Sequence, residues 1–205
     1  MTLKGFIFFG LFICAGLLKA QTDFRPGFIV TISGDSLKGM IDYRGDMLMS
    51  RICKFKSNDN EILEYSPGDI IAFRLNDGKC YISKDVNGED FFLECLIKGR
   101  VSIYYRRDNE GDHYYVDKED LKLAEIPCEE GLRNVDGKSV MYKSAKHYGI
   151  LNYYMQDAPE VRSRIENIKE PERQNLIKLT EDYHKAIGEG DRYIIYEKKT
   201  AIYNR

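Results

Sequence analysis

The stretch that decides the fold is Phe91–Arg106, with the sequence FFLECLIKGRVSIYYR. Two apolar runs in this stretch are separated by Lys98-Gly99-Arg100, a short connection that contains glycine. Side chains along a strand alternate between the two faces of a sheet, which groups Cys95 with the apolar Phe91, Leu93 and Ile97. The segment therefore predicts two antiparallel strands with a buried face.

The same pattern continues on both sides of this stretch. Residues 28–43 contain two apolar-rich runs around Ser33–Ser36, and residues 70–83 repeat the arrangement around Asn76-Asp77-Gly78. Both segments predict β-hairpins with glycine-containing turns. Strand-like runs recur about every 8–12 residues as far as Ile126, which favours an antiparallel roll, barrel or sandwich.

After Pro127 the sequence changes from strand-like to helical patterns. A helix is expected from Ser144 to Met155, and Asp157-Ala158-Pro159-Glu160 has the composition of a helix start. Pro171 should open one more helix, which Gly188 and Gly190 end. The expected buried positions of these two later helices are Val161, Ile165, Ile168, Leu176, Leu179, Tyr183 and Ile187.

The fold class predicted from these patterns is α+β, with an antiparallel β-rich body followed by two or three C-terminal helices. We expect a β-rich domain over residues 21–134. Residues 135–205 should form a helical part that packs on it and ends in a short strand at Tyr193–Tyr196.

The first twenty residues have the composition of a secretory signal peptide. Lys4 precedes an uncharged apolar run from Gly5 to Leu18, and Lys19-Ala20 closes it. The run is too short for a membrane-spanning helix, which needs about 20 apolar residues. We expect cleavage after Ala20 and export to the periplasm or the outer membrane.

Composition limits the classes of partner and cofactor. Without Lys4 and Lys19, 29 basic residues stand against 33 acidic residues, a formal charge of −4. Such a chain lacks the basic excess that binding to a phosphate backbone requires, so a nucleic-acid partner is not expected. Only the leader is long and apolar enough to enter a bilayer, so no transmembrane helix is expected in the mature chain. No cofactor is expected either.

Four cysteines remain once the leader, with Cys14, is removed: Cys53, Cys80, Cys95 and Cys128. An oxidising compartment permits disulfides, and four cysteines allow three pairings. Buried free thiols are the alternative, because an isolated thiol packs as a small hydrophobe. The spacing does not decide between them.

Two short motifs suggest catalysis or nucleotide binding without completing either. Gly34-Asp35-Ser36-Leu37 matches the signature of the GDSL hydrolases, in which the serine is the nucleophile, but no Asp-x-x-His is present to supply its base. Gly131–Ser139 approaches a phosphate-binding loop but has five residues between its glycines instead of four. Both segments are interpreted as turns, and no nucleotide is expected to bind. An envelope serine hydrolase that uses Ser36 stays an alternative function.

The histidines and the tyrosines are the remaining candidates for a site. His113, His147 and His184 have no spacing that predicts metal ligands, so no metal site is expected. Tyr104-Tyr105 and Tyr114-Tyr115 flank one turn, and each pair should place one ring on each sheet face. The outer rings are candidates for stacking against a glycan or a partner; cross-strand packing is the other interpretation.

Several strings together resemble a family. They are Gln21-Thr22-Asp23-Phe24, the Gly34–Gly39 hairpin that leads to Ile41-Asp42-Tyr43, Tyr65–Ile70, and Tyr183-His184 followed by Tyr193–Glu197. The chain is similar to uncharacterised exported proteins of Bacteroidota, in which such a region often precedes an outer-membrane β-barrel. This resemblance implies an envelope location and transfers no catalytic residue.

These observations lead to one functional expectation with two alternatives. The chain is expected to be a non-catalytic binding or interaction domain of the cell envelope, with an outer-membrane protein, another envelope protein or a glycan as partner. The alternatives are the Ser36 hydrolase and a truncated remnant of a barrel protein, because the chain stops at Arg205 where the barrel of its relatives would begin.

Overall fold

The computed structural model describes residues 22–128, 130–188 and 192–196. Their largest unit is one 11-stranded antiparallel sheet, whose strand order is β10-β9-β8-β7-β6-β5-β1-β2-β3-β4, with β13 paired to β7. One short helix lies within the β-rich part of the chain and the others come after residue 145, so the predicted α+β class with a β-rich body is confirmed. The pairing path is open, because β10 and β4 form its two ends.

The elements have the following bounds. The sheet contains β1 (Phe24–Thr31), β2 (Ser36–Asp42), β3 (Cys53–Lys56), β4 (Ile62–Tyr65), β5 (Ile70–Leu75), β6 (Cys80–Val86), β7 (Glu89–Lys98), β8 (Val101–Asp108), β9 (Gly111–Lys118), β10 (Leu121–Ile126) and β13 (Ile194–Ile195). The remaining elements are α1 (Asp46–Met49), β11 (Glu130–Val135), β12 (Lys138–Lys143), α2 (Lys146–Tyr154), the 3-10 turn η1 (Pro159–Val161), α3 (Arg162–Glu166) and α4 (Arg173–Ala186).

The predicted hairpins are present in the structure. β1 pairs with β2, β5 with β6 and β7 with β8, each in antiparallel register. Between β6 and β7 the turn residues Asn87 and Gly88 have φ values of 56° and 91°. Two consecutive positive φ values are typical of the tight hairpin turn that matches the twist of the flanking strands.

One position on β7 departs from simple alternation. Sequence alternation grouped Ile97 with Cys95, but the register of β7 against β8 shifts between these two residues. Cys95 packs with Phe91 and Leu93 on one face, whereas Ile97 packs with the helices on the other. A β-bulge inserts an extra residue and reverses the facing of the positions that follow it, so the prediction for Ile97 is wrong.

The apolar interior is divided among three clusters. The N-terminal cluster, formed largely by β1–β5 and α1, contains Ile29, Ile41, Met49, Cys53, Phe55, Ile70, Phe73, Leu75, Tyr81 and Phe92. The helix-side cluster lies between the helices and the β7–β10 part of the sheet, and it includes Ile103, Val116, Leu151 and Leu176. The third cluster lies on the opposite face of the sheet, on strands β6–β9, and contains Cys80, Ile82, Phe91, Leu93, Cys95, Tyr104 and Tyr115.

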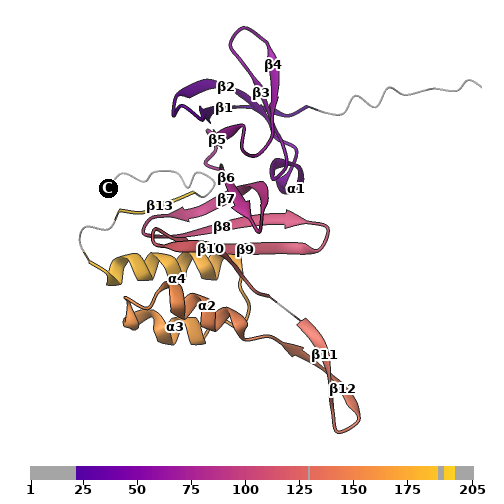
Figure 1. Cartoon of the computed structure of the whole chain (residues 1–205), viewed down its shortest axis with the longest axis vertical. Helices are drawn as coiled ribbons and strands as arrows, with labels where there is room; N and C mark the ends of the chain where they lie inside the picture. Colours follow the sequence, from indigo (N-terminus) through magenta and orange to yellow (C-terminus); the bar gives the residue numbers. More distant parts are fainter. Residues whose placement is uncertain (1–21, 129, 189–191, 197–205) are drawn as a thin grey trace, which may run out of the picture.

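The helices cover one face of the sheet, as Figure 1 shows below β7–β10. The predicted stripe is confirmed, because Leu176, Leu179 and Tyr183 are buried and Ile187 packs against the same cluster. Asp157 does not cap the following turn, whose start at Ala158 has no side-chain cap. Its carboxylate instead accepts hydrogen bonds from Lys118 Nζ at 2.7 Å and from the Tyr183 hydroxyl at 3.1 Å.

β11 and β12 form a sheet of their own that projects from the body in Figure 1. Their connection is Asp136-Gly137, with φ values of 52° and 77°, which confirms the predicted turn. The boundary expected between residues 134 and 135 falls inside this hairpin. Val135, Val140 and Met141 are exposed on it.

The expected leader, residues 1–20, and Gly190 lie outside the described residues. Within the described part of the chain, no helix combines the length and the apolar character that crossing a membrane requires. The predicted last strand is present as β13, which pairs with Ile97 and Lys98 at the end of β7.

Candidate functional site

The four tyrosines that the sequence suggested as a stacking surface lie inside the protein. Tyr104, Tyr105, Tyr114 and Tyr115 have exposed fractions of 2, 4, 6 and 1%. Tyr105 and Tyr114 pack in the helix-side cluster, with ring centroids 5.4 Å apart, and Tyr104 and Tyr115 pack on the opposite face. Each pair does place one ring on each face, but the rings are buried by packing across strands and do not form an exposed aromatic surface for stacking.

Tyr105 and Tyr114 belong to a row of side chains that crosses the sheet. Directly opposed partners place Ile29, Phe73, Tyr81, Glu94, Tyr105, Tyr114 and Ile126 in this row. Opposed residues of an antiparallel pair lie on the same face, so one carboxylate stands in the middle of a buried aromatic row. Glu94 is 2% exposed.

The Glu94 carboxylate is held by two cations that come from distant parts of the chain. Arg173, at the start of α4, donates to both oxygens at 2.7 and 3.0 Å. Lys79, in the β5–β6 turn, donates to Oε2 at 3.2 Å. A buried carboxylate is tolerated when it is paired with cations and hydrogen-bonded in this way. The bidentate arginine–carboxylate contact is among the strongest hydrogen-bonded ion pairs in proteins.

Asp46 on α1 extends this group of charges. Its Oδ1 accepts from Lys79 Nζ at 2.5 Å and from the hydroxyls of Tyr43 and Tyr81 at 3.1 and 3.3 Å. Burial alone would raise the pKa of Asp46, but the hydrogen bond and charge of Lys79 outweigh it and the pKa is lowered. The Arg173 guanidinium also lies 4.5 Å from the centroid of the Tyr105 ring.

We call Asp46, Lys79, Glu94 and Arg173 the charge network. It ties α1, the β5–β6 turn and the start of α4 to the centre of β7. Buried ionisable groups with shifted pKa values are common at active sites, but they also occur in structural ion-pair networks. Here each charged group is neutralised by another member, which fits a structural role. One feature of the sequence indicates this network: Glu94 is the single charged residue inside the apolar run Phe91–Ile97.

The residues of the hydrolase alternative do not meet in the structure. Ser36 is exposed at the start of β2, next to the turn that contains Gly34. His147 and His184 instead contact the carbonyl oxygens of Ile168 and Val101 at 2.8 and 2.9 Å. Both lie on helices that are below β7–β10 in Figure 1, whereas β1 and β2 are above these strands.

His113 lies between two carboxylates on β8–β10. Its Nε2 is 2.9 Å from Asp108 Oδ1 and its Nδ1 is 2.8 Å from Glu125 Oε1. Desolvation lowers the pKa of His113, but the hydrogen bonds to Glu125 and Asp108 outweigh it, so the pKa is raised. Contacts that include His113 and Arg106 more than offset desolvation and lower the pKa of Asp108 to about 2. Within the described residues no cluster of His, Cys, Asp and Glu is arranged to hold a metal ion.

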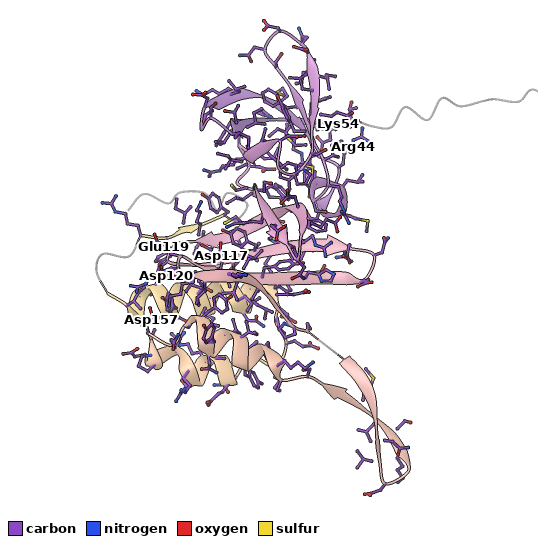
Figure 2. All side chains as sticks on the ribbon, in the orientation of Figure 1. Arg44, Lys54, Asp117, Glu119, Asp120 and Asp157 are labelled. Carbon is purple, nitrogen blue, oxygen red and sulfur yellow. The ribbon has the colours of Figure 1, made fainter. Side chains whose placement is uncertain are left out.

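Tyr104 lines a cleft of about 530 Å³ beside the β9–β10 turn. Figure 2 shows Asp117, Glu119 and Asp120 gathered at this turn. Lys84 is paired with Asp117 at 2.6 Å, and Lys118 is paired with Asp157 at 2.7 Å. Two of the cleft's basic groups are therefore already neutralised, and its lining does not favour an anionic ligand.

The β11–β12 hairpin differs from the charged sites above, because it exposes apolar side chains. Its exposed apolar side chains are Val135, Val140 and Met141, with exposed fractions of 48, 49 and 66%. Its strands pair only with each other in the described structure, so each keeps one edge of backbone N–H and C=O groups outside the ladder. Open edges of this kind pair with strands of other proteins. Sequence patterns predict only the turn of this hairpin.

Comparison of the chain with protein-family models, curated proteins and solved structures found no match.

Replacing Glu94 with Gln should lower the free energy of unfolding by about 3 kcal/mol, because Lys79 and Arg173 would lose the charge that offsets their partial burial. The matched control is Glu64→Gln, which removes an exposed ion pair to Lys54 and should cost less than about 1 kcal/mol. Urea unfolding followed by circular dichroism measures both. If both variants lose the same small amount of unfolding free energy, the charge network contributes little to stability.

His113 should make stability depend on pH. Because its pKa is raised in the folded state, its contribution is complete below the unfolded value of about 6.5 and is lost as pH rises through the folded value. His113→Gln should therefore lower the free energy of unfolding by about 0.5–1 kcal/mol at pH 5.5 and by less at pH 8.5. Urea titrations at the two pH values test this, and a difference that does not change with pH would contradict it.

Proposed function

We propose that the chain is exported to the cell envelope and acts there as a non-catalytic interaction domain that binds a partner protein through the β11–β12 hairpin. The exposed apolar side chains of this projecting hairpin are the observation that carries the proposal. The signal-peptide composition of residues 1–20 supports the envelope location.

The chemistry of the hairpin favours a protein as partner over a glycan. Exposed valine and methionine side chains offer apolar contact, and the free strand edges offer a row of backbone hydrogen-bonding groups. Val135 and Val140 share one face of the hairpin and Met141 lies on the other, because neighbouring residues of a strand alternate. An extended segment of a partner protein uses both features, by adding a strand to the edge and placing its alternate side chains beside the apolar side chains of the two faces. The four tyrosines predicted to stack against a glycan are buried, which removes the observation that favoured a glycan.

The hydrolase alternative has less support. Ser36 is an exposed residue beside a turn, and His113, His147 and His184 lie within hydrogen-bond distance of other groups. A serine needs a base within hydrogen-bond reach to become a nucleophile. The charge network and the buried tyrosines instead hold together the body from which the hairpin projects.

A photo-crosslinking amino acid at Met141 tests the proposal in the full chain, expressed in its native cell. The matched control position is Tyr153 on α2, which is 55% exposed and belongs to the body. We expect a discrete protein adduct from position 141 and none from position 153. The protein in that adduct is then purified, and its affinity is measured directly.

The double variant Val140→Glu/Met141→Glu should weaken binding of that purified protein by about tenfold or more, because two apolar contacts would be replaced by charges. Tyr153→Glu should leave the affinity unchanged. No adduct at position 141, or equal adducts at both positions, would contradict binding through the hairpin. N-terminal sequencing and fractionation test export separately: a chain that begins at Met1 in the cytosol would contradict it.

A further inference from the structure

Cys80 and Cys95 stand directly opposite each other on the neighbouring strands β6 and β7. Opposed residues of an antiparallel pair have Cα atoms about 4.5–5.5 Å apart. Disulfides require Cα separations of about 4.4–6.8 Å, so this register meets the Cα condition. The Cβ atoms of such a pair lie about 4.5–5.5 Å apart and must close to about 3.5–4.5 Å when the bond forms. Both side chains pack in the same cluster, on the face of the sheet opposite the helices.

The other two described cysteines lie elsewhere. Cys53 is buried on β3 in the N-terminal cluster, where it stands opposite Tyr65. Cys128 follows β10 and lines a surface pocket with Tyr114 and Pro171, on the face that the helices cover. Of the pairings that four cysteines allow, the structure therefore brings together only Cys80 with Cys95 among the described residues.

We propose that Cys80 and Cys95 form a cross-strand disulfide when the protein matures in an oxidising compartment. In this step the two thiols lose two protons and two electrons, and one S–S bond forms between the sulfur atoms. The electrons reduce the disulfide of a thiol oxidant, such as glutathione disulfide or a disulfide-carrying oxidase, to two thiols. The compartment rests on the proposed export, whereas the pairing rests on the register alone.

Because both thiols are buried in the folded protein, the bond should form mainly before folding is complete. Cys80 and Cys95 are 7 and 0% exposed, and the structure describes both as free thiols. Burial raises the pKa of the Cys80 thiol to about 11 and also raises that of Cys95. The thiolate is the form that attacks a disulfide, so oxidation should be slow in the completed fold and faster while the chain is still folding.

The bond would join β6 to β7 beside the docking site of β13. Tyr196 packs against the same cluster, and its backbone N–H donates to Leu96 O at 2.9 Å. The loop that the bond closes, from Cys80 to Cys95, contains the β6–β7 turn. A loop of about 15 residues is long enough for a bridge to restrict the unfolded chain substantially.

The test is to unfold and reduce the purified full chain and then refold it in a mixture of reduced and oxidised glutathione. Peptide mapping under non-reducing conditions should find the Cys80 peptide linked to the Cys95 peptide, with the loss of two hydrogen atoms. The oxidised protein should melt about 6–12 °C above the same protein held in dithiothreitol. Because both samples are the wild-type chain, this comparison does not depend on any variant folding.

Variants then assign the bond. Cys80→Ser and Cys95→Ser should each abolish the dithiothreitol-dependent shift, while Cys53→Ser and Cys128→Ser should keep it. Recovery of Cys80 and Cys95 as free alkylated thiols after refolding, or linked to other cysteines, would overturn the proposal. If the bond forms on refolding but the protein in cells is cytosolic, export fails and the pairing stands.

Discussion

The structure depends on a carboxylate that is buried in the middle of a sheet face. Glu94 stands between Tyr81 and Tyr105 in a cross-strand row that is otherwise apolar or aromatic, and it is 2% exposed. Such a charge is stable only with its cations, which arrive from the β5–β6 turn and from the start of α4. Burial of Glu94 therefore requires both the β5–β6 turn, which provides Lys79, and α4, which provides Arg173, to pack against β7.

Alternation along β7 places an ion-paired carboxylate on one face of the sheet and a cysteine thiol on the other. Glu94 points toward the helix side and belongs to the charge network, while its neighbour Cys95 points to the opposite face and meets Cys80. The first arrangement joins elements that are far apart in the chain, and the second joins adjacent strands. The body built in this way carries the β11–β12 hairpin, whose strands pair only with each other in the described structure.

Local patterns predicted much of the fold. The hairpins, the turn at Asp136-Gly137 and the buried stripe of α4 follow from alternation, turn residues and helical spacing, which act over a few neighbouring residues. The bulge that turns Ile97 to the helix side could not be predicted, because register depends on the partner strand.

The candidate site was harder to predict for the same reason. Glu94 is conspicuous within Phe91–Ile97, but its partners Lys79 and Arg173 are 15 and 79 residues away in the chain. The tyrosine pairs were correctly assigned to both faces, yet their burial depends on what covers each face. The opposition of Cys80 to Cys95 likewise follows only from the register across the β6–β7 turn.

Hydrogen exchange, followed peptide by peptide in the wild-type chain and in Glu94→Gln, tests the central claim most directly. If this carboxylate holds distant elements together, its neutralisation should raise exchange both in α1 with the β5–β6 turn and in the first turns of α4. Increased exchange confined to β7 and its immediate neighbours, with α1 and α4 as protected as in the wild type, would contradict the account.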